Sequence, residues 1–386
     1  MTNNVSIIYS LTRSNRPFLN FPLKCNDECR YIYVINIDSK AMRRINCPFG
    51  KDYVMPIPDQ VLTDIISNKC KLVFDYSREN FDCVHSNNLD LTGHFIKNTV
   101  EFYKLAKDQV ILLTGNMIPY KEVPYNVCSL NRAFYTLVPL ASNNFVETQN
   151  KLIFSKHRRQ YKILCLMNVP RMHRIKFAYD IFSNNLRQDN LITCKASNIH
   201  YNLNFFNSTS SNFNSKEFVD SLPWVYDHPV TEKHPKKLLD SQKEENLYTD
   251  SYVNFVIETY FDHTSTYNKN YELDFSEKVS KPISRMQPFV VLGQEGILQY
   301  LHNEGYKTFD RWWDESYDTE VDGNVRYDKV WQIFKYINSL STYQLSEMLL
   351  EMQPILEHNR LLFEENVKSK KYLQEFNDTL IKLFDK

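Results

Sequence analysis

Short, continuous apolar runs alternate with amphipathic segments through the first third of the chain. The apolar runs span residues 5–8, 31–37, 71–76 and 110–114. Continuous apolar runs of this length are typical of strands buried on both faces of a parallel sheet. Between them, residues 57–66 and 91–105 have apolar side chains at helical spacing, and Pro56 and Pro58 mark the start of the first helix. This order of elements predicts βαβ units and a parallel sheet.

The same alternation returns in the second half of the chain. Predicted strands span residues 161–167, 251–258 and 289–292, and predicted helices span residues 175–184, 297–303 and 325–340. Gly305 stands just after a predicted helix, at the position where a left-handed residue commonly ends one. Residues 342–386 are helical in pattern, with an interruption expected at Pro354. Polar stretches at 197–216 and 228–248 are predicted loops.

The length of the chain, 386 residues, is sufficient for two hydrophobic cores. We therefore expect an α/β protein of two domains. The predicted boundaries are residues 1–150 for the first domain and 155–330 for the second, with 331–386 as C-terminal helices that pack back on the core. The polar stretch 141–160 is the expected crossing between the two domains.

The composition is that of a soluble globular protein. Hydrophobic residues make up 42% of the chain and charged residues 24%. Lys and Arg together number 46, as do Asp and Glu, which argues against a protein that coats nucleic acid through bulk positive charge but leaves a local basic groove open. No apolar run approaches the roughly 18 residues of a membrane span, and the N-terminus lacks the features of a signal peptide. The cytoplasm is the expected location.

The eight cysteines are scattered along the chain. Cys25, Cys29 and Cys47 have part of the spacing of a metal site, but no second close pair or His pair completes it. We therefore expect free thiols. Since no Asp-x-Asp motif lies near a predicted strand of the second domain, no metal site is expected either.

Charged residues cluster just before the predicted strand at 289–292. Glu277, Lys278 and Lys281 lie close together, and Arg285 follows one helical turn later. Lysine and arginine side chains bind phosphate, and a carboxylate accepts hydrogen bonds from ribose hydroxyls. The cluster therefore indicates a nucleotide diphosphate site. The alternative is a solvated helix N-terminus with internal ion pairs.

Two other predicted strands end in polar residues. Arg171, His173 and Arg174 lie between a predicted strand and a helix, where free N–H groups and the helix dipole favour phosphate. For His173 we favour a hydrogen bond to phosphate, with acid–base catalysis or packing as alternatives. Glu258 and Thr259 stand at the carboxyl end of the next predicted strand, where ligands gather in α/β sheets. Ordinary loop charge and strand-end packing are the alternatives for these positions.

Three motifs in the second half resemble those of a known family. They are S-E-K-x-x-K-P-I-x-x-x-x-P-F-x-x-x-G at 276–293, L-C-L-x-x-x-P-R-x-H-R at 164–174 and S-Y-V-x-F-V-x-E-T at 251–259. They are similar to signatures of glycosyltransferase-like proteins common in bacteriophages, and the similarity spans about residues 155–330. The first motif also resembles the donor motif T-E-K-[LFV]-x-[KR] of α1,3-fucosyltransferases, which have the GT-B fold.

The resemblance implies a fold and a set of roles. The fold would be two Rossmann-like domains that face a cleft, with the nucleotide sugar bound by the second domain. In the fucosyltransferase motif the Glu holds the ribose and the basic residues hold the diphosphate, which implies these roles for Glu277, Lys278 and Lys281. The sequence departs from the family where Asp274 replaces an aromatic residue of the motif and Val169 replaces an Arg that many relatives have.

The first domain offers candidates for the catalytic base of an inverting sugar transfer. Such a reaction needs a carboxylate to take the proton of the acceptor hydroxyl. Asp75 and Glu79, at the end of the predicted strand 71–76, are the candidates. Asp82 and His85 lie nearby in the sequence and stay open, as does the alternative that these are surface loop residues.

The expected function is therefore transfer of a sugar from a nucleotide-sugar donor to an acceptor, without a cofactor or a metal. If the bacteriophage resemblance holds, the acceptor is a modified base in viral DNA or a glycan, and the location is the host cytoplasm. The alternative is a nucleotide-binding or interaction protein that has the GT-B fold without transferase activity.

Overall fold

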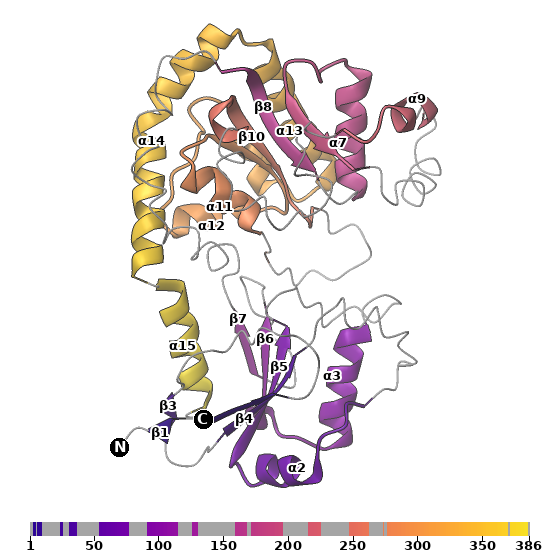
Figure 1. Ribbon diagram of the computed structural model, residues 1–386, viewed down its shortest axis with the longest axis vertical. Coiled ribbons are helices and arrows are strands. Elements are labelled where there is room, and N and C mark those ends of the chain that lie inside the picture. The colour runs from indigo at the N-terminus through magenta and orange to yellow at the C-terminus, as the bar shows by residue number, and fades with distance from the viewer. Residues whose placement is uncertain are drawn as a thin grey trace. The chain divides into compact units, whose positions relative to one another are not determined.

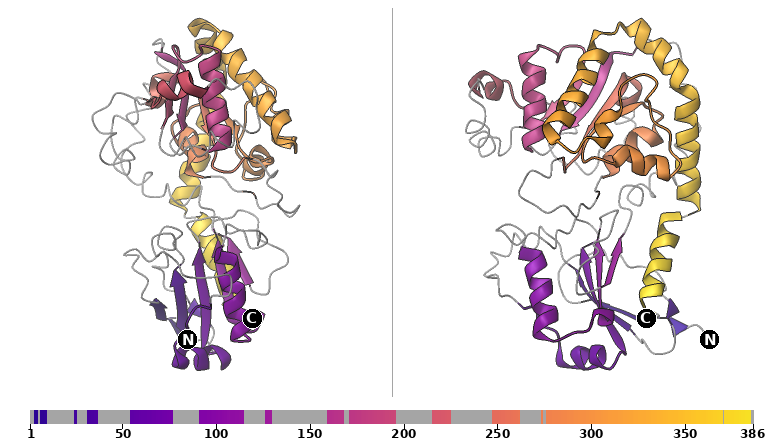
Figure 2. Two further views of the ribbon diagram at one scale, coloured as in Figure 1. Left: turned by 90° about the vertical axis from the view of Figure 1, so that its right-hand side faces the viewer. Right: turned by 180° about the vertical axis from the view of Figure 1, so that it is seen from behind.

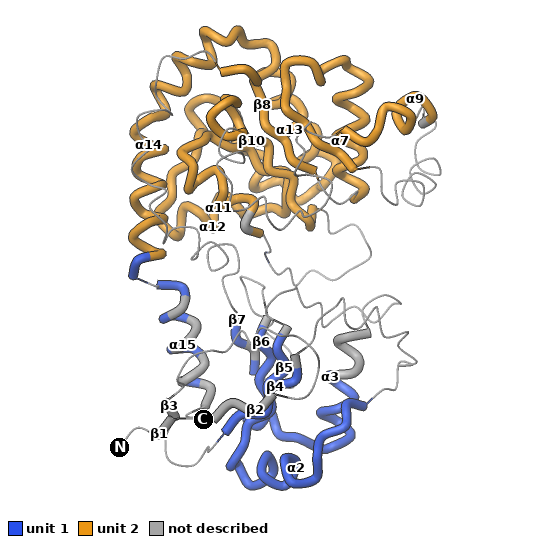
Figure 3. The backbone as a smooth tube through the Cα atoms, viewed as in Figure 1, with its two compact units in different colours: residues 1–135, 263–274, 368–386 blue, residues 136–262, 275–367 orange. Residues whose placement is uncertain are grey.

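The structure divides into two compact units, each of which is described by itself (Figure 3). Unit 1 comprises residues 1–135, 263–274 and 368–386, and unit 2 comprises residues 136–262 and 275–367. The computed structural model describes residues 3–4, 6–9, 24–25, 31–36, 54–76, 91–114, 126–129, 159–167, 171–195, 215–224, 247–261, 273, 276–369 and 371–384. Each unit has an α/β fold of the Rossmann-like kind. The predicted boundary near residue 150 stays a prediction, because it lies outside the described residues.

The sheet of unit 1 has five described strands, all parallel (Figure 1). They are β2 (Ser6–Tyr9), β4 (Tyr31–Asn36), β5 (Cys70–Tyr76), β6 (Val110–Thr114) and β7 (Asn126–Ser129). Their order in the sheet is β2-β4-β5-β6-β7, the same as their order in the chain. Two short strands, β1 (Asn3–Asn4) and β3 (Lys24–Cys25), form a separate antiparallel pair.

Helices α2 (Asp59–Ile66) and α3 (Leu91–Phe102) cover one face of this sheet. Ile65 of α2 and Ile96 of α3 share a buried core with Leu72 and Phe74 of β5. Right-handed crossovers that always step in the same direction put their helices on the same face, which accounts for this arrangement. The short η1 (Lys107–Gln109) leads into β6, and the C-terminal helix α15 (Lys371–Phe384) packs against β7 and β3.

The sheet of unit 2 is also parallel, but its order reverses. Its strands are β8 (Tyr161–Met167), β9 (Leu191–Cys194), β10 (Ser251–Ile257) and β11 (Phe289–Leu292). The order in the sheet is β11-β10-β8-β9, so the chain steps from β8 to β9 and then returns past β8 to β10. Such a reversal leaves a crevice outside the carboxyl ends of the two strands between which it occurs. In unit 2 this switch point lies between β8 and β10.

Seven helices belong to unit 2 in the described part of the chain (Figure 1; Figure 2). They are α7 (Met172–Ser183), α9 (Ser215–Asp220), α11 (Glu277–Ser284), α12 (Ile297–Asn303), η3 (Ser316–Thr319), α13 (Gly323–Ser339) and α14 (Thr342–Lys368). Phe177 of α7 packs against Phe255 of β10 and Phe334 of α13, which binds both helices to one face of the sheet. All residues of β10 are buried, as expected for a central strand covered on both faces.

Most predicted elements are confirmed, and several have the predicted bounds. Strands 110–114, 161–167 and 289–292 and helix 297–303 start and end at the predicted residues. Gly305 has a φ of +90°, and the Tyr306 N–H donates to the Leu301 carbonyl at 2.9 Å, so α12 ends in a Schellman motif. Strands β7 and β9 were not predicted.

The predicted interruption at Pro354 is wrong. Helix α14 continues through Pro354 to Lys368, and the next helix begins at Lys371. Proline removes one hydrogen bond, to the carbonyl four residues earlier. Both Pro354 and Leu350 are exposed, so water can hydrate that carbonyl and the helix continues.

Candidate functional site at the switch point of unit 2

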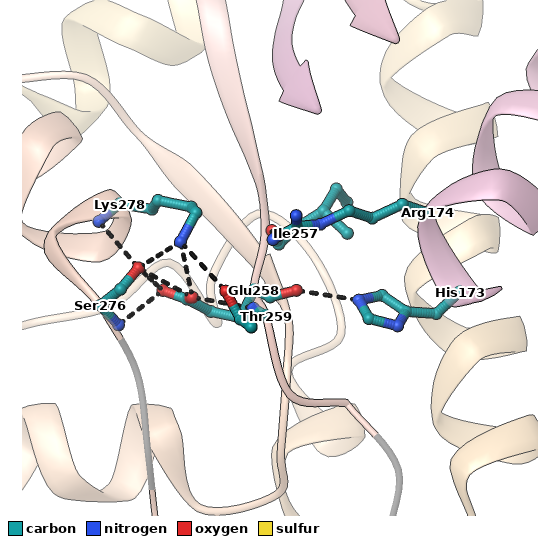
Figure 4. A network of polar contacts seen from close by, with 7 residues as sticks. All are labelled: His173, Arg174, Ile257, Glu258, Thr259, Ser276 and Lys278. Atoms are coloured by element: carbon teal, nitrogen blue, oxygen red, sulfur yellow. Dashed lines mark hydrogen bonds and ion pairs between the residues drawn. The ribbon is translucent and has the colours of Figure 1, made fainter. Parts of the chain in front are cut away.

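Three elements bring polar residues together at the switch point of unit 2 (Figure 4). Strand β10 ends at Ile257 and is followed by Glu258 and Thr259. Helix α7, which follows β8, begins with Met172, and α11 begins with Glu277. The sequence-predicted residues from all three segments therefore lie at one edge of the same sheet.

The carboxylate of Glu258 is the centre of a buried hydrogen-bond network. It is 1% exposed and accepts the backbone N–H of Ser276 at 2.9 Å and that of Thr259 at 3.1 Å. The Ser276 hydroxyl donates to it at 2.9–3.0 Å, and Lys278 Nζ lies 3.3 Å from Oε2. A buried carboxylate needs such partners, because an unpaired one is strongly destabilising. Glu258 therefore fixes the start of α11 against the end of β10.

The directions of these hydrogen bonds follow from the groups involved. A carboxylate only accepts and an ammonium only donates, so the Ser276 hydroxyl donates to Glu258 and accepts from Lys278 Nζ at 2.5 Å. Ser276 also caps α11 by accepting the Lys278 N–H. The remaining contact of Lys278 Nζ, to the Thr259 hydroxyl, is the longest at 3.5 Å. Since the side chain is 29% exposed, an anion at this edge can replace that weakest contact.

His173 lies on the other side of Glu258. Its Nε2 is 2.8 Å from the backbone carbonyl of Glu258, and its ring lies 5.2 Å from that of Phe261. Burial lowers the pKa of His173 to about 3, and the charges of Arg174 and Arg171 act in the same direction, although the hydrogen bond to Glu258 opposes them. The ring is therefore neutral at pH 7. Its one N–H is used on the carbonyl, so it has none to donate to the phosphate that the sequence led us to favour.

The two arginines of this segment differ in position. Arg171 is exposed at the N-cap of α7, where free N–H groups and the helix dipole also favour an anion. Arg174 is 3% exposed and donates to the Ile257 carbonyl at 2.9 Å, and burial lowers its pKa. Arg171 is thus placed to meet a phosphate, whereas Arg174 holds α7 against the end of β10.

Helix α11 places its two lysines on one side. Lys281 lies three residues after Lys278, a spacing that puts both side chains on the same helix face. Lys281 is partly buried and lies in the last turn of this short helix. Glu277 is the first residue of α11, but its side chain is outside the described part of the structure, so its predicted contact with ribose stays a prediction.

A residue that the sequence did not single out supports the site from behind. Arg326 of α13 is 1% exposed, and its guanidinium donates to the carbonyls of Phe261 and Gly293. It also lies over the Phe261 ring, 4.9 Å from the centroid. Arg326 therefore positions Phe261, which in turn packs against His173. A single arginine in an amphipathic helix gives no sequence signal of such burial.

The candidates of the first domain lie in unit 1. Asp75 is 3% exposed at the carboxyl end of β5, in register with Asn36 of β4 and Leu113 of β6. It points to the face opposite the one that carries Phe74, because side chains alternate along a strand. Glu79, Asp82 and His85 lie outside the described residues.

The Trp312-Trp313 pair packs within unit 2. Trp313 is 5% exposed against Phe309, and the Trp312 indole N–H donates to Glu351 at 3.2 Å. Glu315 next to them accepts from the Thr308 hydroxyl at 2.5 Å and from the Phe309 N–H at 2.8 Å. Burial raises the pKa of Glu315 to about 7, and these hydrogen bonds oppose the shift.

The described cysteines and helices add three findings. Cys70, Cys128, Cys165 and Cys194 are buried and free, as predicted. Among the residues that the structure describes, no group of three or more His, Cys, Asp or Glu side chains is arranged to hold a metal ion. No helix in the same set of residues is both long and apolar enough to cross a membrane.

Comparison with known proteins does not identify the chain. No protein-family model matches it, and a search of curated proteins finds no significant relative. The site has an exposed arginine at one helix N-terminus, a lysine at another, and the buried Glu258 at the switch point between them. The carboxylate of Glu258 contacts the start of α11, and its backbone carbonyl accepts a hydrogen bond from His173 of α7.

Proposed function

We propose that the protein is a glycosyltransferase that binds a nucleotide-sugar donor at the switch point of unit 2. The observation that carries this proposal is the convergence of Arg171, His173, Glu258 and Lys278 at the carboxyl ends of β8 and β10. Nucleotides bind at this place in open parallel sheets. The sequence similarity to bacteriophage glycosyltransferase-like proteins and to the fucosyltransferase donor motif falls on the same residues, which supports the same ligand.

In this proposal the basic residues act on the leaving group. Transfer of the sugar leaves negative charge on the nucleoside diphosphate, and cations already in place stabilise it. Lys278 and Lys281 would do so from α11, and Arg171 from the N-terminus of α7. Arg174 would hold α7 in position, and Glu277 would accept hydrogen bonds from the ribose. The Glu258 carboxylate would set the position of Lys278 without touching the donor.

The rest of the proposal concerns the other half of the reaction. We propose a GT-B arrangement in which unit 1 binds the acceptor, a modified base in viral DNA or a glycan, in the cytoplasm of the producing cell. The reaction would need no cofactor and no metal, since the three cations supply the charge that a metal supplies in other transferases. Glu79 stays a candidate for the base that deprotonates the acceptor.

Nucleotide binding without transfer is the second candidate function. What favours it is the position of Asp75, the described candidate for the base, which is 3% exposed. A general base must come within hydrogen-bond reach of the hydroxyl that it deprotonates. If neither Glu79 nor another group takes that role, the site would bind a nucleotide and leave it unchanged.

A thermal-shift screen against nucleotides and nucleotide sugars tests the proposal. A ligand at a hundred times its dissociation constant stabilises the folded state by about 2.7 kcal/mol, which is readily measured. We expect one nucleotide family to raise the melting temperature of the wild type. Lys281→Ala should abolish the shift, and Lys307→Ala, a matched change at an exposed lysine of unit 2, should preserve it.

Two outcomes separate the candidate functions. A shift followed by transfer to DNA or to a glycan acceptor supports the transferase. A shift without transfer to any acceptor, and without hydrolysis of the nucleotide sugar, supports nucleotide binding alone. No shift with any nucleotide would contradict both.

A further inference from the structure

The His173 ring is held in one orientation. The carbonyl oxygen of Glu258 can only accept a hydrogen bond, so Nε2, 2.8 Å away, must carry the ring proton. Phe261 packs against the ring at 5.2 Å, and Arg326 fixes Phe261 through its carbonyl and its ring. The tautomer and the plane of the imidazole are therefore set by the protein before any ligand binds.

This orientation decides the chemistry of the other ring nitrogen. In a neutral imidazole with the proton on Nε2, Nδ1 has a lone pair and only accepts hydrogen bonds. Within the described part of the structure, Nδ1 makes no hydrogen bond, and Figure 4 shows it on the side of the ring away from Glu258. The burial and the neighbouring arginine charges that lower the pKa of His173 keep the second proton off the ring.

We propose that Nδ1 of His173 accepts a hydrogen bond from a sugar hydroxyl of the bound nucleotide sugar. This inference rests on the proposed function and adds a residue that determines specificity. Phosphate oxygens at pH 7 are acceptors and would be repelled by the lone pair, whereas a hydroxyl can donate to it. Arg171 at the N-cap of α7 and Lys278 on α11 would provide the phosphate contacts, so the hydroxyl would lie next to the diphosphate.

Two amide substitutions separate the two ring nitrogens. In His173→Gln the amide nitrogen can reach the position of Nε2 and donate to the Glu258 carbonyl, but no acceptor remains at Nδ1. In His173→Asn the shorter side chain places its amide near the position of Nδ1 and gives up the contact with Glu258. His173→Gln therefore removes the acceptor at Nδ1 and keeps the hydrogen bond to the Glu258 carbonyl. His173→Asn keeps an acceptor near Nδ1 and removes the hydrogen bond to Glu258.

Calorimetry of UDP, GDP and their 2′,3′-dideoxy analogues tests the inference. We expect the wild type to bind the ribonucleotide that it prefers more tightly than the dideoxy form, and we expect His173 to account for a factor of about five to ten of that difference, since one neutral hydrogen bond contributes about that much. His173→Gln should reduce the difference by this factor and leave the part that comes from the proposed contact of Glu277 with the ribose, and His173→Asn should retain more of it. If His173→Gln leaves the ratio of ribonucleotide to dideoxy affinity unchanged but weakens binding of the nucleotide sugar, the hydroxyl belongs to the transferred sugar.

Other outcomes overturn the inference and leave the proposed function standing. Equal affinity of wild type and His173→Gln for every ligand would show that Nδ1 touches none of them. An equal loss for the ribo and dideoxy forms would show a structural role only. ¹⁵N NMR of the histidine ring at pH 7 gives a test without ligand, because a ring protonated at Nδ1 contradicts the assignment. Failure of the wild type to bind any nucleotide would instead contradict the proposed function.

Discussion

Both units contain a parallel sheet, but the two sheets differ in the order of their strands relative to the order along the chain. In unit 1 the described strands follow one another in chain order, and α2 and α3 cover the same face. In unit 2 the order in which strands are added to the sheet reverses between β8 and β10, although the two strands are parallel. Only a reversal splits the connections to opposite sides and opens a crevice at the carboxyl edge. Polar residues at the carboxyl ends of strands are therefore stronger evidence for a ligand site in unit 2 than in unit 1.

The acidic residues at the two edges show this difference. Glu258 of unit 2 is buried and joins β10 to α11 through Ser276, Thr259 and Lys278. Asp75 of unit 1 is also buried, but it lies at the end of a sheet without a reversal among its described strands. A carboxylate at a strand end is thus informative about ligand binding when the topology around it is known.

The largest expected effect comes from removing the buried carboxylate of unit 2. Glu258→Ala leaves the Ser276 and Thr259 N–H groups without their acceptor and the Lys278 ammonium without its counter-charge, so we expect unit 2 to lose about 3–5 kcal/mol of stability. Nucleotide binding should be lost as well. Chemical denaturation followed by nucleotide titration of the folded fraction measures both.

The matched change in unit 1 sharpens the comparison. Asp75→Asn removes one charge at the corresponding edge, and we expect nucleotide affinity to be unchanged. If Asp75→Asn weakened nucleotide binding as much as Glu258→Ala, the assignment of the donor site to unit 2 would be wrong.

Two partly buried ionisable groups of unit 2 have opposite effects on stability as the pH changes. Glu315 has its pKa raised from 4.5 to about 7, so its contribution is present below pH 4.5 and is lost as the pH rises through 7. His173 has its pKa lowered from 6.5 to about 3, so its contribution is present above pH 6.5 and is lost as the pH falls toward 3. Between pH 5 and pH 8 the contributions of Glu315 and His173 to stability therefore change in opposite directions.

Single variants isolate the contributions of Glu315 and His173 to the pH dependence of stability. When the pH rises from 5 to 8, the free energy of unfolding of Glu315→Gln should increase by about 2–3 kcal/mol relative to that of wild type. Over the same rise, the free energy of unfolding of His173→Gln should decrease by about 2 kcal/mol relative to that of wild type. Urea denaturation at the two pH values measures both. In unit 1 the described groups with shifted pKa values are Tyr31, Tyr33 and Cys128, which burial keeps protonated throughout this range. Parallel curves for wild type and both variants would contradict the account.

A third comparison concerns one lysine of each unit. Lys278→Ala removes a proposed phosphate contact, so we expect the affinity for the nucleoside diphosphate to fall tenfold to hundredfold, or about 2 kcal/mol. Lys71 of unit 1 is buried and donates to the Asp108 carbonyl at 2.6 Å. Lys71→Ala should lower stability and leave nucleotide affinity unchanged. Calorimetry at two salt concentrations checks this, because only the Lys278 variant should also show a weaker salt dependence.

The smallest expected effects come from two glycines at the edge of unit 2. A Cβ at Gly293 would lie 2.6 Å from Ile297 Cδ1 and 3.3 Å from Glu258 Cβ, whereas one at Gly296 would meet no atom within 4 Å. Gly296 has a φ of +85°, which strains other residues by about 1 kcal/mol. We expect Gly293→Ala to lose about 1–2 kcal/mol and some nucleotide affinity, and Gly296→Ala to lose about 1 kcal/mol and no affinity. The reverse order of nucleotide affinities would show that the β11 end does not support the site.

The sequence was sufficient for the strands and helices with strong periodicity. Buried strands such as 161–167 and 289–292 are continuous apolar runs, and the glycine after α12 marks a helix end that needs a positive φ. The order of strands in a sheet has no such local signal, so the reversal in unit 2 could not be predicted. The interruption predicted at Pro354 was wrong because a helix tolerates a proline where its face is exposed, and exposure depends on the tertiary structure.

For the site, the sequence indicated the residues but not their partners. The motif containing Glu277 and Lys278 suggested that these neighbours act together, yet Lys278 pairs with Glu258, which is twenty residues earlier in the chain. Ser276 could have been recognised as the N-cap before a helix. Arg326 could not, because its burial depends on the carbonyls of Phe261 and Gly293 that surround it.

The most direct test of the switch-point site is hydrogen exchange of the whole protein with and without a saturating nucleoside diphosphate, chosen from UDP, GDP, ADP and CDP by the thermal-shift screen. The account predicts slower exchange at residues 171–176, 258–261 and 276–281 of unit 2, and unchanged exchange at 70–76 and 110–114 of unit 1. Slower exchange confined to the unit 1 segments would contradict it, because the nucleotide would then bind at the sheet that has no reversal among its described strands.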